Sequence, residues 1–571
     1  MRNPENVLIS LTKHSNQKDY KYERLYRLLY NEEMYLIAYQ NIYANDGNMT
    51  KGTDNQTVDG MSIERIQKII LSLKDESYQP KPARRTYIPK KNGKLRPLGI
   101  PSFDDKLLQE VIRMILEAIY EGYFEYTSHG FRPNRSCHTA LSRIQKTFTG
   151  VKWFIEGDIK GFFDNINHNT LINILSERIK DERFLRLIRK FLNAGYVENW
   201  TFYNTYSGTP QGGIISPILA NIYLDKFDKY VNEYAQRFRK GEHRMRTKEY
   251  RRNEVELRNA RAALKAANDD LEKENAIARI RQIEKERVNI PQGDPMDKNY
   301  ARLLYVRYAD DWLCGVIGSK EDCKTIKEDF KTYLYNKLHL ELSEEKTLIT
   351  NAQKSAKFLS YEIRVRNSNL TKRDKTGRLV RNYTGRVVLE VSNDTIKKHL
   401  LNIGAMKLTY HNGKEIWKPK AMYRLKDCDD LEILDYYNSM IRGFYNYYCI
   451  ANNNSIINNY KYIMEYSMYK TYGTKYRTSI KKIIGKFRIG KDFAVKFKSA
   501  KGNEIIRIFY NKGFKRQEKA FSPNEDNVPN YMKYFGGTSL IDRIKAKRCE
   551  VCGKENEPIE IHHIHRLKDL Q

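Results

Sequence analysis

Apolar residues follow two different periods along the chain, and the change of period predicts short strands between longer helices. Helical spacing marks Met1–Tyr43, Ser62–Leu73, Lys106–Tyr120, Thr170–Leu192, Ile214–Tyr234 and Leu431–Ile484. Arg85–Ile100 alternates around Asn92-Gly93, which predicts a hairpin. Trp153–Asp158 predicts a strand that ends on an acid, and Tyr300–Ile317 predicts a strand pair. This mixture of helices and strands predicts an α+β multidomain fold.

One segment breaks this alternation. Residues from about 238 to 290 consist largely of Arg, Lys, Glu, Ala and Asn. Inside it, the 3-4-3-4 spacing of a coiled-coil seam is followed by Leu257, Ala260, Leu264, Ala267 and Leu271. Asn268-Asp269-Asp270 supplies residues that favour a turn. The pattern predicts a helical hairpin that is inserted between two other blocks.

The chain carries a large excess of positive charge. Its 571 residues include 102 Lys and Arg against 70 Asp and Glu, which gives a formal net charge of +32. Two basic runs, Arg364–Arg386 and Lys470–Arg516, hold much of this excess. Tyr469, Tyr472, Tyr476 and Tyr510 lie within or beside the second run, and rings between cations can stack on unpaired bases. The charge favours a nucleic-acid partner, whereas half-buried tyrosines on a solvated helix face are the alternative for each run.

The same composition argues against other classes of protein. No apolar run approaches the roughly 20 residues of a membrane-spanning helix, and residues 1–15 lack the apolar core of a secretory signal. The seven cysteines form no disulfide framework, since only Cys549 and Cys552 are close in sequence. We therefore expect a protein of a reducing cytoplasm that has no membrane partner.

Three carboxylates stand at the ends of predicted strands. Asp158 ends the strand that begins at Trp153, and Asp310 and Asp311 occupy the turn of the Tyr300–Ile317 pair. If these strand ends are neighbours, their oxygens suit Mg²⁺, and two such ions can stabilise both oxygens of an in-line phosphoryl transfer. Ordinary turn chemistry is the alternative for Ala309-Asp310-Asp311, because Asp is common in hairpins.

The blocks around these acids resemble, in order and spacing over about 25–361, the reverse transcriptases that group II introns encode, also called maturases. The blocks are Leu95–Pro101, His129–Pro133, Phe154–Asp164, Ser207–Pro217, Tyr308–Asp311 and Leu342–Thr347. Asp435–Asn438 and Gly443–Tyr448 resemble the thumb of that family, domain X. Ser360 departs from the pattern, because the family usually has Gly at this turn.

The resemblance implies a right-hand polymerase: fingers and palm with an antiparallel palm sheet, an α-helical thumb, and a basic C-terminal DNA-binding region. The implied divisions are 1–84 for an N-terminal extension and the start of the fingers, 85–365 for fingers and palm with the helical insertion at about 238–290, 366–485 for the thumb or domain X, 486–545 for the DNA-binding region and 546–571 for an incomplete HNH endonuclease segment.

The resemblance also implies site residues. Asp158, Asp310 and Asp311 are expected to be catalytic and to hold two Mg²⁺ ions together with the backbone carbonyl of Ile159, with Asp311 the less critical acid of its pair. The nucleotide is expected to be bound by Lys90, Arg96, Ile159, Phe163, Gln211 and Lys346. Phe163 is expected to exclude a ribose 2′-hydroxyl, with core packing as its alternative, and Arg132 to position template or a loop.

The C-terminal segment resembles the opening of an HNH endonuclease. Cys549 and Cys552 supply two of the four ligands that a structural zinc needs, and His563 matches the general base. A second cysteine pair and the later histidine are missing before Gln571. We therefore expect Zn²⁺ only in a complete C-terminal domain and no endonuclease activity from this chain.

The resulting hypothesis is an RNA-directed DNA polymerase and maturase that acts within a ribonucleoprotein. It would bind group II intron RNA, assist splicing, and copy the intron into DNA during retrohoming. Its expected partners are intron RNA, a DNA target site, a template–primer duplex and deoxynucleoside triphosphates; no oligomeric state follows from the sequence. The alternatives are a splicing-only RNA-binding maturase, a retron or diversity-generating reverse transcriptase, and a nuclease.

Overall fold

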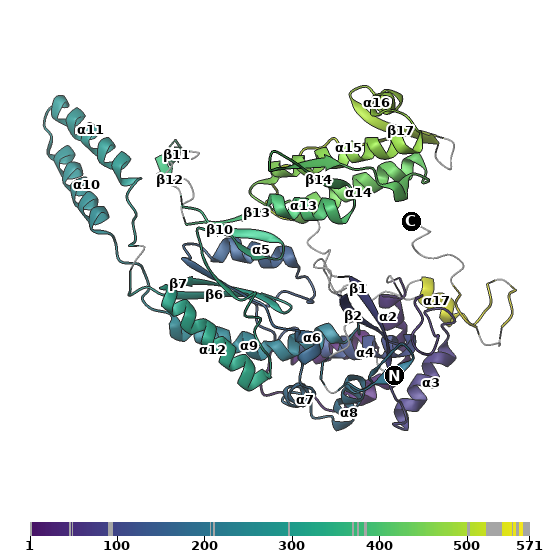
Figure 1. The fold of residues 1–571 in the computed structure, drawn as a ribbon. Helices are drawn as coiled ribbons and strands as arrows, with labels where there is room; N and C mark the ends of the chain where they lie inside the picture. The colour runs from purple at the N-terminus through teal and green to yellow at the C-terminus, as the bar shows by residue number, and fades with distance from the viewer. Residues whose placement is uncertain are drawn as a thin grey trace.

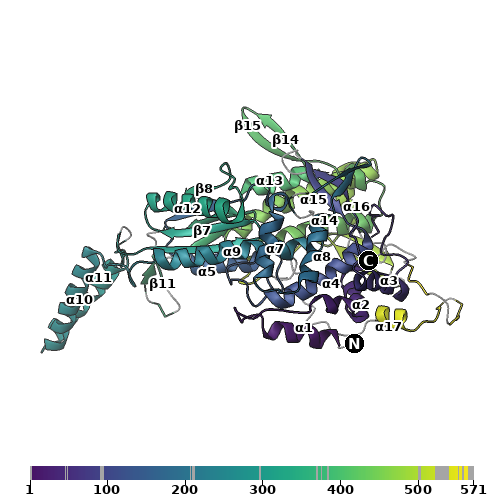
Figure 2. The ribbon, with the colours of Figure 1, turned by 90° about the horizontal axis from the view of Figure 1, so that it is seen from below.

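The computed structural model of the chain describes residues 3–44, 47, 49–89, 95–205, 207–208, 212–294, 297–367, 371–373, 376–377, 379–381, 385–498, 503–520, 539–550, 552–555 and 559–562. Two four-stranded sheets, a layer of N-terminal helices and a C-terminal block of helices account for most of them (Figures 1 and 2). This combination confirms the predicted α+β class.

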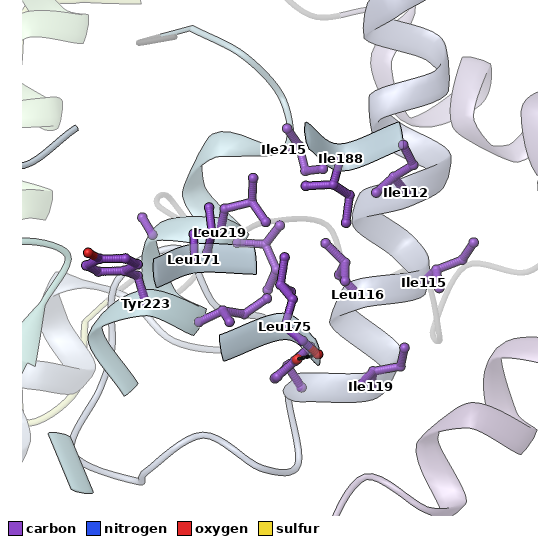
Figure 3. Close-up of a cluster of buried hydrophobic side chains, with 14 of the residues drawn as sticks. Ile112, Ile115, Leu116, Ile119, Leu171, Leu175, Ile188, Ile215, Leu219 and Tyr223 are labelled. Carbon is purple, nitrogen blue, oxygen red and sulfur yellow. Dashed lines mark hydrogen bonds between the residues drawn. The ribbon is translucent and has the colours of Figure 1, made fainter. Parts of the chain in front are cut away.

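The N-terminal helices pack around one long buried helix, α4. They are α1 (Pro4–Lys13), α2 (Glu32–Ile42), α3 (Ile63–Lys74), α4 (Phe103–Tyr120), α7 (His168–Ser176), α8 (Glu182–Leu192) and α9 (Ser216–Phe238), with a 3₁₀ turn at Tyr26–Tyr30. Ser62, Ser102 and Asn167 cap the first turns of α3, α4 and α7. In Figure 3, Leu116 of α4 lies among side chains of α7 and α9, including Leu175. The predicted helix Thr170–Leu192 is two helices.

The first of the two larger sheets, called the peripheral sheet, has the strand order β2-β1-β4-β5. Its strands are β1 (Ala83–Pro89), β2 (Leu95–Ile100), β4 (Tyr196–Glu198) and β5 (Thr201–Tyr203). β1 and β2 pair antiparallel, which confirms the predicted hairpin, and β4 runs parallel to β1. A two-residue turn joins β4 to β5.

The second sheet, called the central sheet, is antiparallel and has the order β6-β7-β3-β8. Its strands are β3 (Trp153–Gly157), β6 (Arg302–Tyr308), β7 (Asp311–Ile317) and β8 (Leu348–Asn351). Alternate side chains point to opposite faces. Ile155 and Cys314 join the core with α9 and α12 (Lys320–Leu338), whereas Phe154 and Leu313 join the core with α5 (Cys137–Thr147). The sheet therefore separates the two main cores of the molecule.

The predicted insertion is a helical arm. α10 (Lys248–Ala266) and α11 (Asp270–Arg287) run back along each other and extend away from the rest of the molecule in both views (Figures 1 and 2). Leu257, Ala260 and Ile283 form its small core. The predicted seam does not reach Leu271, whose side chain is 70% exposed, because the chain reverses at Ala267–Asp269 and Leu271 belongs to the second helix.

The C-terminal helical block contains α13 (Asn393–Asn402), α14 (Asp430–Tyr448), α15 (Ile457–Lys475) and α16 (Ile480–Phe487), with 3₁₀ turns at Tyr423–Leu425 and Asn454–Ile456. The chain from residue 356 onward also forms four small sheets, and these are β9 (Ala356–Phe358), β10 (Tyr361–Val365) and β13 (Val387–Glu390); β11 (Thr371–Arg373) and β12 (Leu379–Arg381); β14 (Met406–His411) and β15 (Lys414–Pro419); β16 (Arg488–Ile489), β17 (Asp492–Lys498) and β18 (Glu504–Ile508). Phe493, Phe509 and Phe514 share its core.

The tyrosines of the second basic run are part of this core. Tyr469 and Tyr472 are buried among the side chains that hold α14, α15 and β17 together. Tyr476 donates to the Asp430 carboxylate, and Tyr510 stacks on Phe514. Base stacking is therefore the wrong interpretation for Tyr469 and Tyr472, and packing is the right one, because helical spacing turns both rings inward.

The chain returns to the N-terminal helices at its end. Helix α17 (Ser539–Lys545) packs against α2, with Ile541 and Ile544 buried and Lys545 paired with Glu33 at 2.7 Å. Ile561 forms a bridge with Met61. Among the helices that the structure describes, none is both long and apolar enough to cross a lipid bilayer.

Candidate active site

The central sheet brings the three predicted acids together. β3 and β7 run antiparallel with Gly157 opposite Trp312, so Asp158 and Asp311 are the next residues along neighbouring strands. Tyr308 pairs with Asp311 across a two-residue turn that contains Ala309, at φ 55°, and Asp310. The strand ends are therefore neighbours, as the sequence predicted.

Two glycines allow this close approach. A Cβ atom at Gly157 would lie 2.0 Å from the Trp312 ring, and one at Gly130 would lie 2.4 Å from the Ala309 nitrogen. Any side chain at Gly130 would therefore displace the turn that carries Asp310. Asn221 of α9 donates to the Gly130 carbonyl oxygen at 2.8 Å and keeps this contact in place.

A fully buried ion pair supports the same turn from below. The Arg307 guanidinium contacts both carboxylate oxygens of Asp228, at 2.8 and 2.6 Å, and neither side chain is exposed. It also donates to the Ala309 carbonyl oxygen at 2.7 Å and to the Ser128 hydroxyl oxygen at 2.8 Å. Burial lowers the pKa of Arg307, but the charge and the hydrogen bonds of the Asp228 carboxylate more than offset this effect, so the pKa is raised overall. Arg307 thus links α9 to the turn that carries Asp310.

Burial and the neighbouring carboxylates raise the pKa of two of the acids, Asp310 and Asp311. Burial and the charges of Asp310 and Asp158 raise the pKa of Asp311 to about 7. Burial and the charge of Asp158 raise the pKa of Asp310 as well. Lys346 donates to an Asp158 carboxylate oxygen at 2.7 Å, and this hydrogen bond raises the pKa of the lysine. One ammonium group faces three carboxylates, so the site retains an excess of negative charge.

The acids line an open cleft of about 1600 Å³. Other lining residues come from the peripheral sheet, from α6 (Phe162–Asn165) and from the segment before β8, and they include Arg96, Phe163 and Lys346. Phe163 is half-buried and packs edge-on against Phe162 with ring centroids 5.2 Å apart. Gly212 packs on the Gly99 carbonyl oxygen, where a Cβ atom would lie at 2.5 Å.

The structure therefore gathers Asp158, Asp310, Asp311, Arg96, Phe163 and Lys346 in one cleft. Ile159, whose side chain is buried, follows Asp158 and pairs with Leu342. Lys90, Gln211 and His563 lie outside the described residues. Arg132 is buried and donates to Glu121 and to the Ser128 carbonyl oxygen, so it holds a loop, as expected. The Arg307–Asp228 pair was missed; an arginine inside an otherwise apolar strand is the signal that could have found it.

Among the described residues, no three His, Cys, Asp or Glu side chains are placed so that they enclose an ion. Cys549 and Cys552 lie in a tight loop in which the Gly553 N–H donates to the Cys549 carbonyl oxygen, and Cys552 is exposed. The acids fit a divalent cation in chemical type, since carboxylates with raised pKa values are stabilised by a nearby cation.

Paired acids on a hairpin turn and a third acid at the next strand end line one cleft together with Arg96 and Lys346. This combination of residue types is typical of a nucleotidyl-transfer site. The family described as "Reverse transcriptase (RNA-dependent DNA polymerase)" matches residues 88–246, which contain Asp158. The family described as "Type II intron maturase" matches 384–543, and "AI2M/AI1M-like, HNH endonuclease" matches 549–571.

Similar proteins extend this match to the whole chain. "Group II intron-encoded protein LtrA" of Lactococcus lactis subsp. cremoris is 44% identical, over 99% of this chain and 94% of its own length. The "Uncharacterized 91 kDa protein in cob intron" of Schizosaccharomyces pombe is 37% identical, over 100% of this chain and 69% of its own. The chain therefore belongs to the group II intron-encoded reverse transcriptases with a maturase region. The similarity continues through the maturase region, which argues against a retron or diversity-generating enzyme.

Proposed function

We propose that this reverse transcriptase adds deoxynucleotides to a primer at the cleft beside Asp158 and Asp310, and that it binds its own intron RNA, assists splicing and carries out retrohoming. The observation that carries the polymerase assignment is the convergence of three carboxylates on neighbouring strand ends beneath a cleft that also holds Arg96 and Lys346. In-line phosphoryl transfer needs this combination of anionic metal ligands and phosphate-binding cations.

The proposed architecture is a right hand. The peripheral sheet serves as part of the fingers, the central sheet as the palm, and the C-terminal helical block as the thumb that holds the duplex. The proposed divisions remain 1–84, 85–365, 366–485, 486–545 and 546–571. Support comes from the cleft, which is lined by both sheets, and from the separate cores on the two faces of the central sheet.

Two Mg²⁺ ions are the proposed cofactors, held by Asp158, Asp310 and Asp311 with the carbonyl oxygen of Ile159. When bound, such ions supply electrostatic stabilisation of the attacking and leaving oxygens. The chain fixes the ligands: Arg307 and Gly130 hold the turn of Asp310 and Asp311, and the pairing of β3 with β7 sets the position of Asp158.

The remaining residues act on the nucleotide. Arg96, with Lys90 and Gln211, would bind the triphosphate and sugar, because a guanidinium can hold phosphate oxygens in a bidentate manner. Lys346 is positively charged at neutral pH, since its pKa is raised, and it would neutralise the leaving pyrophosphate. Phe163 would fill the space that a ribose 2′-hydroxyl needs.

The test is primer extension on an RNA template by Asp158→Ala, with Asp164→Ala as the matched control. Asp164 is an exposed acid in the same cleft that is not at a strand end. Extension should be abolished by the first change, at every Mg²⁺ concentration, and should survive the second. Equal activity of the two variants would contradict the assignment.

The basic region after α16 is proposed to bind the DNA target. Lys512 and Lys515 are exposed beside α14, whereas Arg516 donates to the Ile450 carbonyl oxygen and so also holds the fold. Neutralising Lys512 and Lys515 should weaken DNA binding and flatten its salt dependence by roughly 0.9 in log–log slope per lost phosphate contact. Loss of splicing with unchanged DNA affinity would reassign this surface to RNA.

A further inference from the structure

The peripheral sheet exposes an unusual amount of apolar surface. Trp200, at the turn between β4 and β5, is 100% exposed. Five other exposed apolar side chains of the sheet are divided between its two faces by the strand register: Tyr87, Leu95 and Tyr203 lie on one face, and Ile88 and Phe202 lie on the other. Exposed aromatic and apolar side chains that share one face of a folded protein commonly mark a binding surface.

Trp200 also has a backbone conformation that its side chain does not favour. Glu198 pairs with Thr201, so Asn199 and Trp200 are the two central residues of the turn, and their φ angles are 49° and 67°. Positive φ at both positions defines a type I′ turn, for which Asn-Gly is the preferred sequence. A bulky residue at positive φ is strained. Because the side chain is fully exposed, packing within the described chain does not account for the tryptophan.

A ladder of stacked groups crosses the same sheet. The Arg85 guanidinium lies 3.8 Å from the ring centroid of Tyr196, and the Tyr196 and Tyr203 rings stack with centroids 5.1 Å apart and planes at 15°. Tyr203 is on β5, the edge strand, so no strand of the described chain covers the end of the ladder. A planar group could extend the stack there.

The ladder lies on the face away from the active-site cleft. Side chains alternate along a strand, and Arg85 and Tyr87 stand opposite Gly99 and Pro97. Arg96 and Leu98, which line the cleft, therefore point to the other face.

The charge of this sheet suits a polyanion. Residues 83–100 contain no acid and carry the cations Arg84, Arg85, Lys90, Lys91, Lys94 and Arg96. The hairpin of β4 and β5 contributes one acid, Glu198, which accepts a hydrogen bond from the Tyr87 hydroxyl at 2.6 Å. Aromatic rings beside cations bind single-stranded nucleic acid through stacking and phosphate contacts.

We propose that Trp200 and the Arg85–Tyr196–Tyr203 ladder bind an unpaired RNA strand, whose bases stack on Trp200 and on the open end of the ladder. This site is distinct from the polymerase cleft. The proposal rests on the proposed function only for the identity of the polyanion, which is RNA. The unpaired strand can come from the template ahead of the primer or from a loop of the intron RNA.

Trp200→Gly gives the sharpest test, because it separates folding from binding. It creates the Asn-Gly sequence that the turn prefers, so the melting temperature should equal or exceed that of the wild type. Affinity for an unstructured RNA oligomer of roughly 16 nucleotides should fall by about 5- to 150-fold, the effect of losing one stacked base. Trp200→Phe should retain most of the affinity. Tyr410→Ala, which removes a 70% exposed ring from the β14–β15 hairpin, is the matched control and should bind normally.

The two sources of RNA are distinguished by the probe. If Trp200→Gly loses affinity only for template–primers with a long 5′ overhang, the bound strand is the template. If it loses affinity only for intron RNA, the bound strand is a loop of the intron. Either result supports the site. Unchanged affinity of Trp200→Gly for every RNA probe would overturn it, as would an equal loss in Tyr410→Ala. A change of oligomeric state without a change in RNA affinity would show a protein interface instead. Extension on a template with a minimal overhang should stay at the wild-type rate, so failure of this site leaves the polymerase assignment intact.

Discussion

Arg307→Met tests the buried support of the polymerase turn. The substitution leaves the Asp228 carboxylate fully buried without the guanidinium that now contacts both of its oxygens. Breaking a buried ion pair from one side costs about 3–5 kcal/mol. Typical domains are stable by only about 5–15 kcal/mol, so the loss of unfolding free energy should be large.

The same change removes the donor to the Ala309 carbonyl oxygen, and with it one restraint on Asp310. A displacement of catalytic groups by about 1 Å can lower a rate by roughly 10²-fold, and we expect a fall in kcat of that order with little change in nucleotide KM. The double variant Arg307→Met/Asp228→Leu should recover most of the stability, because apolar replacement of a buried ion pair is often neutral. Its kcat should remain low, because the turn still lacks its donor.

Urea unfolding followed by tryptophan fluorescence measures the loss of unfolding free energy, and steady-state primer extension measures the fall in kcat. Tyr305→Phe is the control: it removes one hydrogen bond to Asp228, of 2.8 Å, and leaves the contact of Arg307 with the turn. A loss below about 1 kcal/mol in Arg307→Met would refute the energetic reasoning. Wild-type kcat in the double variant would refute the positioning role.

Four further predictions concern the acids, Phe163 and the β9–β10 turn. Burial and neighbouring charges raise the pKa of Asp311 to about 7, so protons compete with cations for its carboxylate below this pH. The Mg²⁺ concentration for half-maximal extension should therefore rise as pH falls below 7. A constant Mg²⁺ requirement between pH 6 and 8 would count against Asp311 as a ligand. In the metal-free protein this raised pKa lowers stability as pH rises from about 4 to 7, and Mg²⁺ should restore more stability at pH 8 than at pH 5, as melting curves can show. Phe163→Val should admit ribonucleotides, and an unchanged ratio of deoxy- to ribonucleotide incorporation would make Phe163 a packing residue. Ser360→Gly should stabilise the β9–β10 turn, where Ser360 has φ 62°, by about 0.5–1 kcal/mol in urea unfolding; destabilisation would show that the serine makes a compensating contact.

The sequence predicted the elements that local pattern controls. The β1–β2 hairpin, the β6–β7 pair and the helical arm follow from alternation, turn residues and helical spacing. The convergence of Asp158 with Asp310 and Asp311 also followed, because each acid ends a strand. The departure at Ser360 pointed to a turn, and the structure shows positive φ at both Leu359 and Ser360.

Features that depend on long-range packing were not predictable in this way. The Arg307–Asp228 pair joins residues 79 positions apart, and no local period relates them. Tyr469 and Tyr472 lie at the start of a basic run, yet helical packing buries them. Trp200, the most exposed aromatic residue of the peripheral sheet, lies in a short hairpin without such a run. The tertiary fold determines whether each ring is buried or exposed, so sequence composition alone does not predict it.

We propose that polymerisation at the strand-end acids and assistance to splicing are separate activities of one chain. The most direct measurement is a paired assay of Asp310→Ala for cDNA synthesis on an RNA template and for splicing of the intron RNA. We predict no cDNA and near wild-type splicing, because chemistry needs the carboxylate whereas RNA affinity comes from distant cations. Full cDNA synthesis by Asp310→Ala, or loss of splicing together with cDNA synthesis, would contradict the account.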